Sequence, residues 1–417
     1  MSIGYACLAI AVLGSEMKTC IQANATEKNL LSLIEHNLHA LETLVDYNQA
    51  NDIRLFRISS DLIPFGSSVA KDIPWMTIFA NQWKAIGEKI TRSGMRVSMH
   101  PGQYTVLNSP SPDVVTRAIL DLQYHKCVLS SLGLDNKHKI VLHIGGVYGD
   151  KTEATKRFIE TYQHLNEDIR QRLVLENDDR MYTISEVLTI AEQVGAPVIF
   201  DNLHHAVNPP DESQSEIDWI RRCSVTWGEK DGRQKIHYSQ QNREKRPGAH
   251  TETIAIDTFM CFYDRLKGTD IDIMLEVKDK NMSAMKCINC TSYRSIRALE
   301  EEWGRYKYLI LEKSPETYIA VRKLLHDKNE YPAREMYHML DDALSIPFHA
   351  GHAVNAAEHV WGYFKNKATP TEKKRYQNLL RELARGEKAK FAMKRNLLSL
   401  SRKYKEDYLI QGYYFYL

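Results

Sequence analysis

Histidines and acidic residues stand at the ends of six apolar segments in the first 280 residues of the chain. The segments read VSMH, KIVLH, LVLE, VIFD, KIH and IMLE, and their last residues are His100, His143, Glu176, Asp201, His237 and Glu276. Two further histidines, His204 and His250, follow the fourth and fifth of these segments. Imidazole and carboxylate groups are common ligands of divalent metal ions. Because eight ligands exceed the needs of one ion, the sequence predicts a multinuclear metal site.

Such a cluster favours one kind of chemistry. A single histidine or glutamate at the end of an apolar segment is more often a hydrogen-bonded structural residue. Several carboxylates packed together without cations, however, would cost several kcal/mol in repulsion and desolvation. Clustered metal ions remove that cost and suit phosphodiester hydrolysis, since one ion lowers the pKa of a water molecule while others bind the phosphate oxygens.

Lys235 precedes His237 by two residues, so both side chains lie on one face of an extended segment. An ammonium group that points into a cluster of cations is strongly disfavoured. We therefore expect Lys235 to be neutral or to be carboxylated, in which case it would bind metal. The alternative is a side chain that turns away to a phosphate.

Eight short segments rich in apolar and β-branched residues must position these side chains. They cover residues 3–10, 53–59, 95–100, 139–144, 173–176, 198–201, 234–237 and 271–276. Helical patterns separate them, and the clearest begins after Thr26, a predicted N-cap. Eight alternating units in about 280 residues predict an α/β fold of the (β/α)8, or TIM, barrel type. The carboxyl ends of its strands meet on one face, where the chemistry of such barrels takes place.

The pattern changes near residue 300, which divides a barrel domain (1–300) from a helical appendage (301–417). The second part shows helical periodicity rich in Lys, Arg, Leu and Tyr. Residues 361–417 contain 14 Lys or Arg and 5 Asp or Glu, so the rest of the chain is acidic. This asymmetry points to a polyanionic partner. The alternative is a set of solvated helices whose lysines maintain solubility.

Other classes of protein and site lack support in the sequence. No apolar run approaches the roughly 18–20 residues that cross a membrane. No glycine-rich phosphate-binding motif follows a predicted strand, so we expect no nucleotide cofactor. The seven cysteines are odd in number and mostly scattered, which indicates free thiols in the cytoplasm. Cys287 and Cys290 form a lone CxxC pair, too little for a zinc site.

Seven motifs together resemble the UV damage endonuclease family. They are RISSDLIPF (57–65), HPGQY (100–104), LHIGG (142–146), LENDD (175–179), FDNLHH (200–205), KIHYS (235–239) and MLEVKDK (274–280). With the first strand they cover about residues 3–282, two thirds of the chain. The resemblance implies a barrel related to endonuclease IV that cuts damaged double-stranded DNA immediately 5′ to UV photoproducts (cyclobutane dimers and 6-4 products), with Mn²⁺ as the usual metal. Zn²⁺ and Mg²⁺ remain alternatives, and we expect a monomer.

The resemblance also assigns ligands to particular ions. It implies that His100, His143 and Glu176 hold one ion, and that Glu176 bridges to a second ion. The second ion would be bound by Glu176 together with Asp201, His237 and Glu276. A third ion would be bound by His204 and His250. We expect the catalytic residues to be Glu176, Lys235 and Glu276.

Gln103 and Tyr104 match the pair with which this family probes the lesion. An aromatic ring can fill the space left by a flipped base, and an amide can bind the orphaned partner bases. Tyr5 matches a third lesion contact. The chain departs from the family at Ala9, where an Asn is frequent, and at Ser67 and Ser68, where a His is frequent. The alternative is that Tyr104 simply packs over the mouth of the barrel.

Three other functions remain open at this stage. An abasic-site endonuclease of the endonuclease IV type would use the same metal site. A metal-dependent sugar isomerase has the same fold, but it needs fewer histidines and no basic appendage. A DNA-binding protein with structural metals would bind tightly without cutting.

Overall fold

The computed structural model describes residues 1–211 and 214–417, which divide into two compact units. The barrel unit comprises Met1–Ala9, Gly14–Ile254 and Phe262–Met285. The helical unit comprises Ile10–Leu13, Ala255–Cys261 and Lys286–Leu417.

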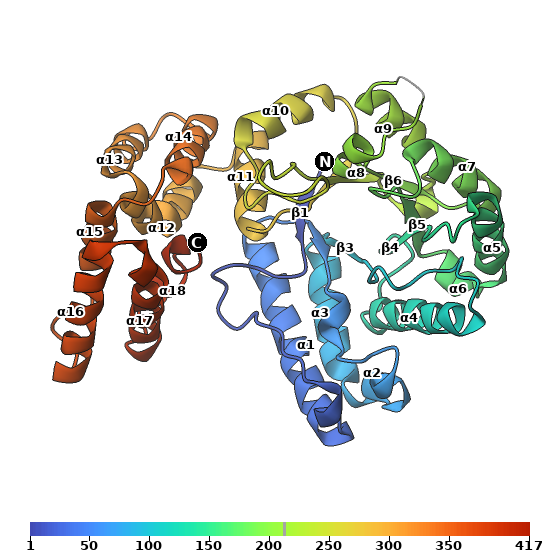
Figure 1. Ribbon diagram of the computed structural model, residues 1–417, viewed down its shortest axis with the longest axis horizontal. Coiled ribbons are helices and arrows are strands. Elements are labelled where there is room, and N and C mark those ends of the chain that lie inside the picture. The colour runs from blue at the N-terminus through green and yellow to red at the C-terminus, as the bar shows by residue number, and fades with distance from the viewer. Residues whose placement is uncertain (212–213) are drawn as a thin grey trace. The chain divides into compact units, whose positions relative to one another are not determined.

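Eight parallel strands close the barrel unit in the order of the sequence (Figure 1). They are β1 (Ile3–Ala6), β2 (Leu55–Arg57), β3 (Arg96–Met99), β4 (Lys139–His143), β5 (Leu173–Glu176), β6 (Val198–Asp201), β7 (Lys235–Tyr238) and β8 (Asp272–Leu275). β1 pairs with β2 on one side and with β8 on the other, which completes the circle. The predicted (β/α)8 barrel is therefore confirmed.

Helices follow the strands, and those before residue 255 belong wholly to the barrel unit. They are α1 (Glu27–Ala50), α2 (Trp75–Ile78), α3 (Ala80–Arg92), α4 (Pro112–Ser131), α5 (Lys151–His164), α6 (Glu167–Arg170), α7 (Ile184–Val194), α8 (Asn202–Val207), α9 (Glu216–Ser224), α10 (Ile256–Arg265) and α11 (Asn281–Thr291). The α1 helix shows how the sequence determines them. The Thr26 side chain accepts a hydrogen bond from the backbone of Asn29, as expected of an N-cap, and residues at spacings of three and four from Leu30 onwards are buried.

The first strand is shorter than predicted. It ends at Ala6 rather than at residue 10, because Cys7 adopts a left-handed backbone conformation with φ 70° that an extended strand does not allow. Leu8 is consequently exposed. The other seven strands lie within two residues of their predicted bounds.

The helical unit confirms the predicted helical appendage. Its further helices are α12 (Ile296–Lys313), α13 (Pro315–Leu324), α14 (Ala333–Ser345), α15 (Ala350–Trp361), α16 (Pro370–Arg385), α17 (Lys390–Lys403) and α18 (Asp407–Ile410). Two contacts tie its later helices together. The Trp361 and Tyr376 rings stack with centroids 4.0 Å apart, and the buried Lys394 amine lies 2.5 Å from a Glu312 oxygen. No helix in the described part of the chain has the length and apolar character to cross a membrane.

A buried ion pair lies at the amino-terminal end of the strands, opposite the predicted site. Lys139 begins β4, and its amine is 2.6 Å from an Asp231 oxygen and 2.7 Å from the Gln171 carbonyl oxygen. Both charged side chains are almost fully buried. Burial lowers the pKa of Lys139, while Asp231 acts to raise it. Each charge thus depends on its partner in this interior.

We predict that Asp231→Ala lowers the free energy of unfolding by about 3–5 kcal/mol, because it leaves the Lys139 charge buried without its partner. Urea denaturation measures the loss. Lys139→Met combined with Asp231→Leu should regain most of it, since the double variant buries no charge. If the single and double variants were equally unstable, side-chain packing rather than charge would explain the loss.

Candidate metal centre

The carboxyl ends of the strands bring the predicted ligands together. His143, Glu176 and Asp201 are the last residues of β4, β5 and β6, and His100 and Glu276 directly follow β3 and β8. Because parallel strands run in register, pairs such as His143 with Glu176 and Asp201 with His237 stand side by side. The fold therefore places six ligands from six neighbouring strands on one rim.

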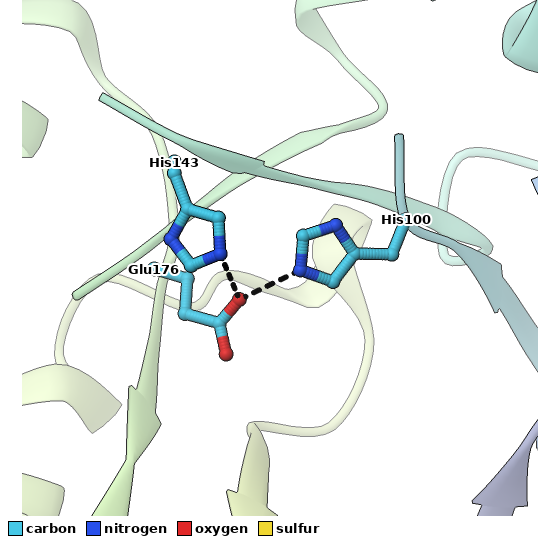
Figure 2. Close-up of side chains that lie close together, drawn as sticks. All are labelled: His100, His143 and Glu176. Atoms are coloured by element: carbon cyan, nitrogen blue, oxygen red, sulfur yellow. Dashed lines mark hydrogen bonds and ion pairs between the residues drawn. The ribbon is translucent and has the colours of Figure 1, made fainter. Parts of the chain in front are cut away.

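The first group of ligands consists of His100, His143 and Glu176 (Figure 2). The Nε2 atoms of the two histidines lie 3.0 and 3.4 Å from the same carboxylate oxygen, Oε2 of Glu176. Figure 2 shows both imidazole rings pointing toward this oxygen from either side. This arrangement leaves two nitrogens and one oxygen directed at a common position.

The second group shares Glu176 with the first and adds Asp201, His237 and Glu276. Nδ1 of His237 contacts the other oxygen of Glu176, Oε1, and lies 3.3 Å from Oε1 of Glu276. The two oxygens of Glu176 therefore face different groups. A carboxylate in this position is suited to bridging two ions.

Burial controls the charge of these ligands. It lowers the pKa of His100, His143 and His237, which favours the neutral imidazole that binds metal. Burial also raises the pKa of Asp201 to about 6. Burial acts likewise on Glu276, but the Arg57 guanidinium outweighs it and holds the pKa of Glu276 well below its usual range.

Divalent metal ions fit this set of side chains. Oδ2 of Asp201 is buried and has no hydrogen-bond partner among the described residues, although a carboxylate oxygen can bind a cation. The donors are nitrogen and oxygen without sulfur, as first-row divalent ions accept. Glu176 and Asp201 are fully buried, so water can do little to stabilise their negative charges.

The other two predicted ligands lie beside the two groups rather than within them. His204 is on α8, its Nδ1 atom is 3.8 Å from Asp201, and its ring centroid is 5.6 Å from that of His143. Burial opposes protonation of His204, but nearby carboxylates, Asp201 first, raise its pKa to about 9. Nε2 of His250 lies 3.9 Å from Oε2 of Glu276. Within the described residues, neither histidine joins a group of three ligands.

Arg57 is a residue of this centre that the sequence analysis did not single out. It ends β2, is buried, and its guanidinium forms an ion pair with Glu276 and lies 3.1 Å from Nε2 of His237. The signal was present in the sequence, since Arg57 opens the RISSDLIPF motif at the end of an apolar strand. In the structure it is the cation that lies among the carboxylates of the second group.

Lys235 begins β7 and is buried. Burial lowers its pKa well below the usual range, and the positive charges of Arg96 and Arg57 act in the same direction. Its side chain leaves the strand on the same face as His237.

The predicted lesion contacts separate into two environments. Tyr104 is 72% exposed and, with Gln103, lines a cavity of about 800 Å³ whose wall includes Ser67 and Ser68. Tyr5 has no exposed surface, because its ring packs on Phe56 and its hydroxyl donates a hydrogen bond to Asn48. This position gives Tyr5 a part in barrel packing rather than a contact with a partner.

The CxxC pair takes no part in the centre. Neither Cys287 nor Cys290 forms a disulfide, and the two lie one turn apart on α11. Burial raises the pKa of Cys290 to about 12, so its thiol stays protonated at neutral pH.

Fold and rim together define a class of protein: a (β/α)8 barrel with a candidate dinuclear metal centre at the carboxyl ends of its strands. Residues 1–306 match the model of the family described as UV-endonuclease UvdE, and the chain belongs to this family. Residues 307–417 match a second model, described as a protein of unknown function (DUF1722).

Relatives and a solved structure agree with the family assignment. The chain is 40% identical to a UV DNA damage endonuclease of Clostridium perfringens over 354 residues, which cover 83% of this chain and 84% of the relative. It is 34% identical to a UV DNA damage endonuclease of Bacillus mycoides over 276 residues, or 66% and 86% of the two chains. The crystal structure of SacUVDE matches with a TM-score of 0.65 and 37% identity, covering 70% of this chain and 97% of that one.

We predict that Arg57→Met lowers the free energy of unfolding of the metal-free protein by about 3 kcal/mol, because Glu276 then lacks its buried counterion. Added Mn²⁺ should reduce this loss, since bound cations compensate the same carboxylates. Urea denaturation with and without Mn²⁺ measures both effects.

Arg96→Met is the matched control, because Arg96 pairs with Asp272 at the opposite end of the barrel. The loss of stability caused by Arg96→Met should be the same with and without Mn²⁺. If Mn²⁺ left the stability loss of Arg57→Met unchanged, the guanidinium and the metal would not act on the same carboxylates.

Proposed function

We propose that this chain is a metal-dependent endonuclease that cuts duplex DNA immediately 5′ to UV photoproducts. The observation that carries the proposal is Glu176, whose two oxygens face two separate groups of metal ligands. Membership of the UV-endonuclease family supports the choice of substrate. We propose the cytoplasm as its location, since the described cysteines form no disulfide, and a monomer as its working form.

Two or three divalent ions would occupy the rim. His100, His143 and Glu176 would hold the first, and Glu176, Asp201, His237 and Glu276 the second. His204 and His250 lie where they would complete a third. We propose Mn²⁺, with Zn²⁺ or Mg²⁺ as alternatives. When bound, such ions lower the pKa of a coordinated water and stabilise negative charge on phosphate oxygens.

The chain's own residues prepare this rim for a phosphodiester. Glu176 and Glu276 are proposed as catalytic residues because their carboxylates belong to the two groups of metal ligands and supply negative charge to them. Lys235 is the third proposed catalytic residue, and it is buried on the same face of β7 as His237. Arg57 fixes the Glu276 carboxylate, and the buried walls around Glu176 and Asp201 exclude water.

Gln103 and Tyr104 are proposed to recognise the lesion. They follow His100 by three and four residues, and Gly102 lies in the turn between the metal ligand and the probe. A side chain at position 102 would clash with Tyr104, since a Cβ there would lie 2.4 Å from its ring. The same loop can therefore hold His100 on the rim while presenting an exposed aromatic ring to the duplex.

We predict that Glu176→Gln abolishes nearly all incision while the fold survives, because glutamine keeps the shape of the bridge and removes its charge. The assay uses defined duplexes that carry a cyclobutane dimer, a 6-4 product or an abasic site, each with Mn²⁺. Glu160→Gln, an exposed position on α5, is the control and should cut normally. Normal cutting by Glu176→Gln would reject the bridge, and cutting of only the abasic duplex would assign a different lesion.

We also predict that alanine at both Gln103 and Tyr104 reduces incision at photoproducts about tenfold to hundredfold, since stacking is worth about 1–3 kcal/mol per base. Metal content and affinity for undamaged DNA should change little, because phosphate contacts dominate that affinity. A lesion in an unpaired bulge should regain part of the loss, as its opening is already done. Equal rates on paired and bulged lesions would make these two residues packing residues.

A further inference from the structure

A groove of about 740 Å³ lies in the helical unit, and none of the residues that the proposed reaction uses lines it. Its walls come from α12, α13 and the segment around α18. Aromatic and basic side chains line it: Trp303, Tyr318, Tyr408, Arg305, Lys307, Arg322 and Lys328. Clefts of about 300–1,000 Å³ are the usual size of ligand sites.

The charge of the groove is positive once its internal ion pairs are taken into account. Of its two acidic residues, Glu300 lies 2.5 Å from the Lys328 amine and Glu301 lies 3.0 Å from Arg297. Lys307 and Arg322 have no carboxylate within ion-pairing distance in the part of the chain that the structure describes. These two cations are therefore available to an anionic ligand.

Each of these cations lies beside an aromatic ring. The Lys307 amine is 4.7 Å from the ring centroid of Tyr308 and 5.0 Å from that of Tyr408, which is 45% exposed. The Arg322 guanidinium is 5.7 Å from the ring of Tyr318, which in turn packs against Trp303. Alternating cations and ring faces suit a ligand that alternates phosphates and flat bases.

We propose that this groove binds a single strand of DNA, with phosphates on Lys307 and Arg322 and a base against the exposed part of the Tyr408 ring. The inference rests on the proposed function, which makes DNA the partner of the chain. A single strand fits better than a duplex, because stacking on a ring requires bases whose faces are open. The whole segment 286–417 is basic, with 24 Lys or Arg against 16 Asp or Glu, which favours an extended polyanion over a small free nucleotide.

The test measures binding of the full chain to a short, undamaged, fluorescent oligothymidylate over a series of salt concentrations. Lys307→Gln with Arg322→Gln should weaken binding about tenfold and lower the slope of log K against log salt by about 1.4, or about 0.7 for each phosphate that the variant no longer neutralises. Tyr408→Leu keeps the bulk of the side chain but removes the ring, and should weaken binding about fivefold or more with little change in slope.

Matched controls lie outside the groove in the same unit. Lys373→Gln with Arg375→Gln removes the same charge from exposed positions on α16, and Tyr293→Leu removes another exposed ring. Both should leave affinity and slope nearly unchanged. The readout does not involve incision, so it stands even if the proposed endonuclease activity is not found.

Four results would overturn the proposal. Unchanged binding by the groove variants would show that the groove is not the binding site. An equal loss of affinity in the control variants would show that the affinity comes from the overall positive charge of the unit. Displacement of the oligothymidylate by thymidine monophosphate at matched nucleotide concentration would make the groove a site for free nucleotides. Tighter binding of a duplex of equal length would likewise reject the single strand.

Discussion

The structure depends on how three carboxylates can be held together with little contact with water. Glu176 and Asp201 are fully buried and Glu276 nearly so, and each would repel the others if it were charged alone. Three imidazoles and the Arg57 guanidinium surround them in the structure. Such a cluster is costly for stability alone, and metal ions compensate it best. The proposed metal ions would supply this compensation at the rim before any substrate arrives.

The barrel separates this costly cluster from the interactions that stabilise the fold. At the amino-terminal ends of the strands, Lys139 pairs with Asp231 and Arg96 pairs with Asp272. At the carboxyl ends, buried atoms such as Oδ2 of Asp201 lack a partner among the residues that the structure describes. A buried carboxylate oxygen without a partner at the carboxyl ends is consistent with rigid strands that support a reactive site.

The sequence alone predicts the barrel and its rim well, and the reasons are physical. A parallel strand inside a barrel must be apolar, so a His, Asp or Glu at its end stands out, and Glu176 was found in this way. Arg57 was missed because one arginine at the end of an apolar strand does not reveal its partners. The burial of Tyr5 depends on Asn48 and Phe56, which are far from it in the sequence. The end of β1 depends on the backbone conformation of Cys7, which no residue preference indicated.

The central claim is that Glu176 bridges two ions, and anomalous diffraction from crystals grown with Mn²⁺ tests it most directly. The account predicts two manganese peaks, one on the side of Oε2 facing His100 and His143, and one on the side of Oε1 facing His237. A single ion, or ions that Glu176 does not contact, would contradict the account.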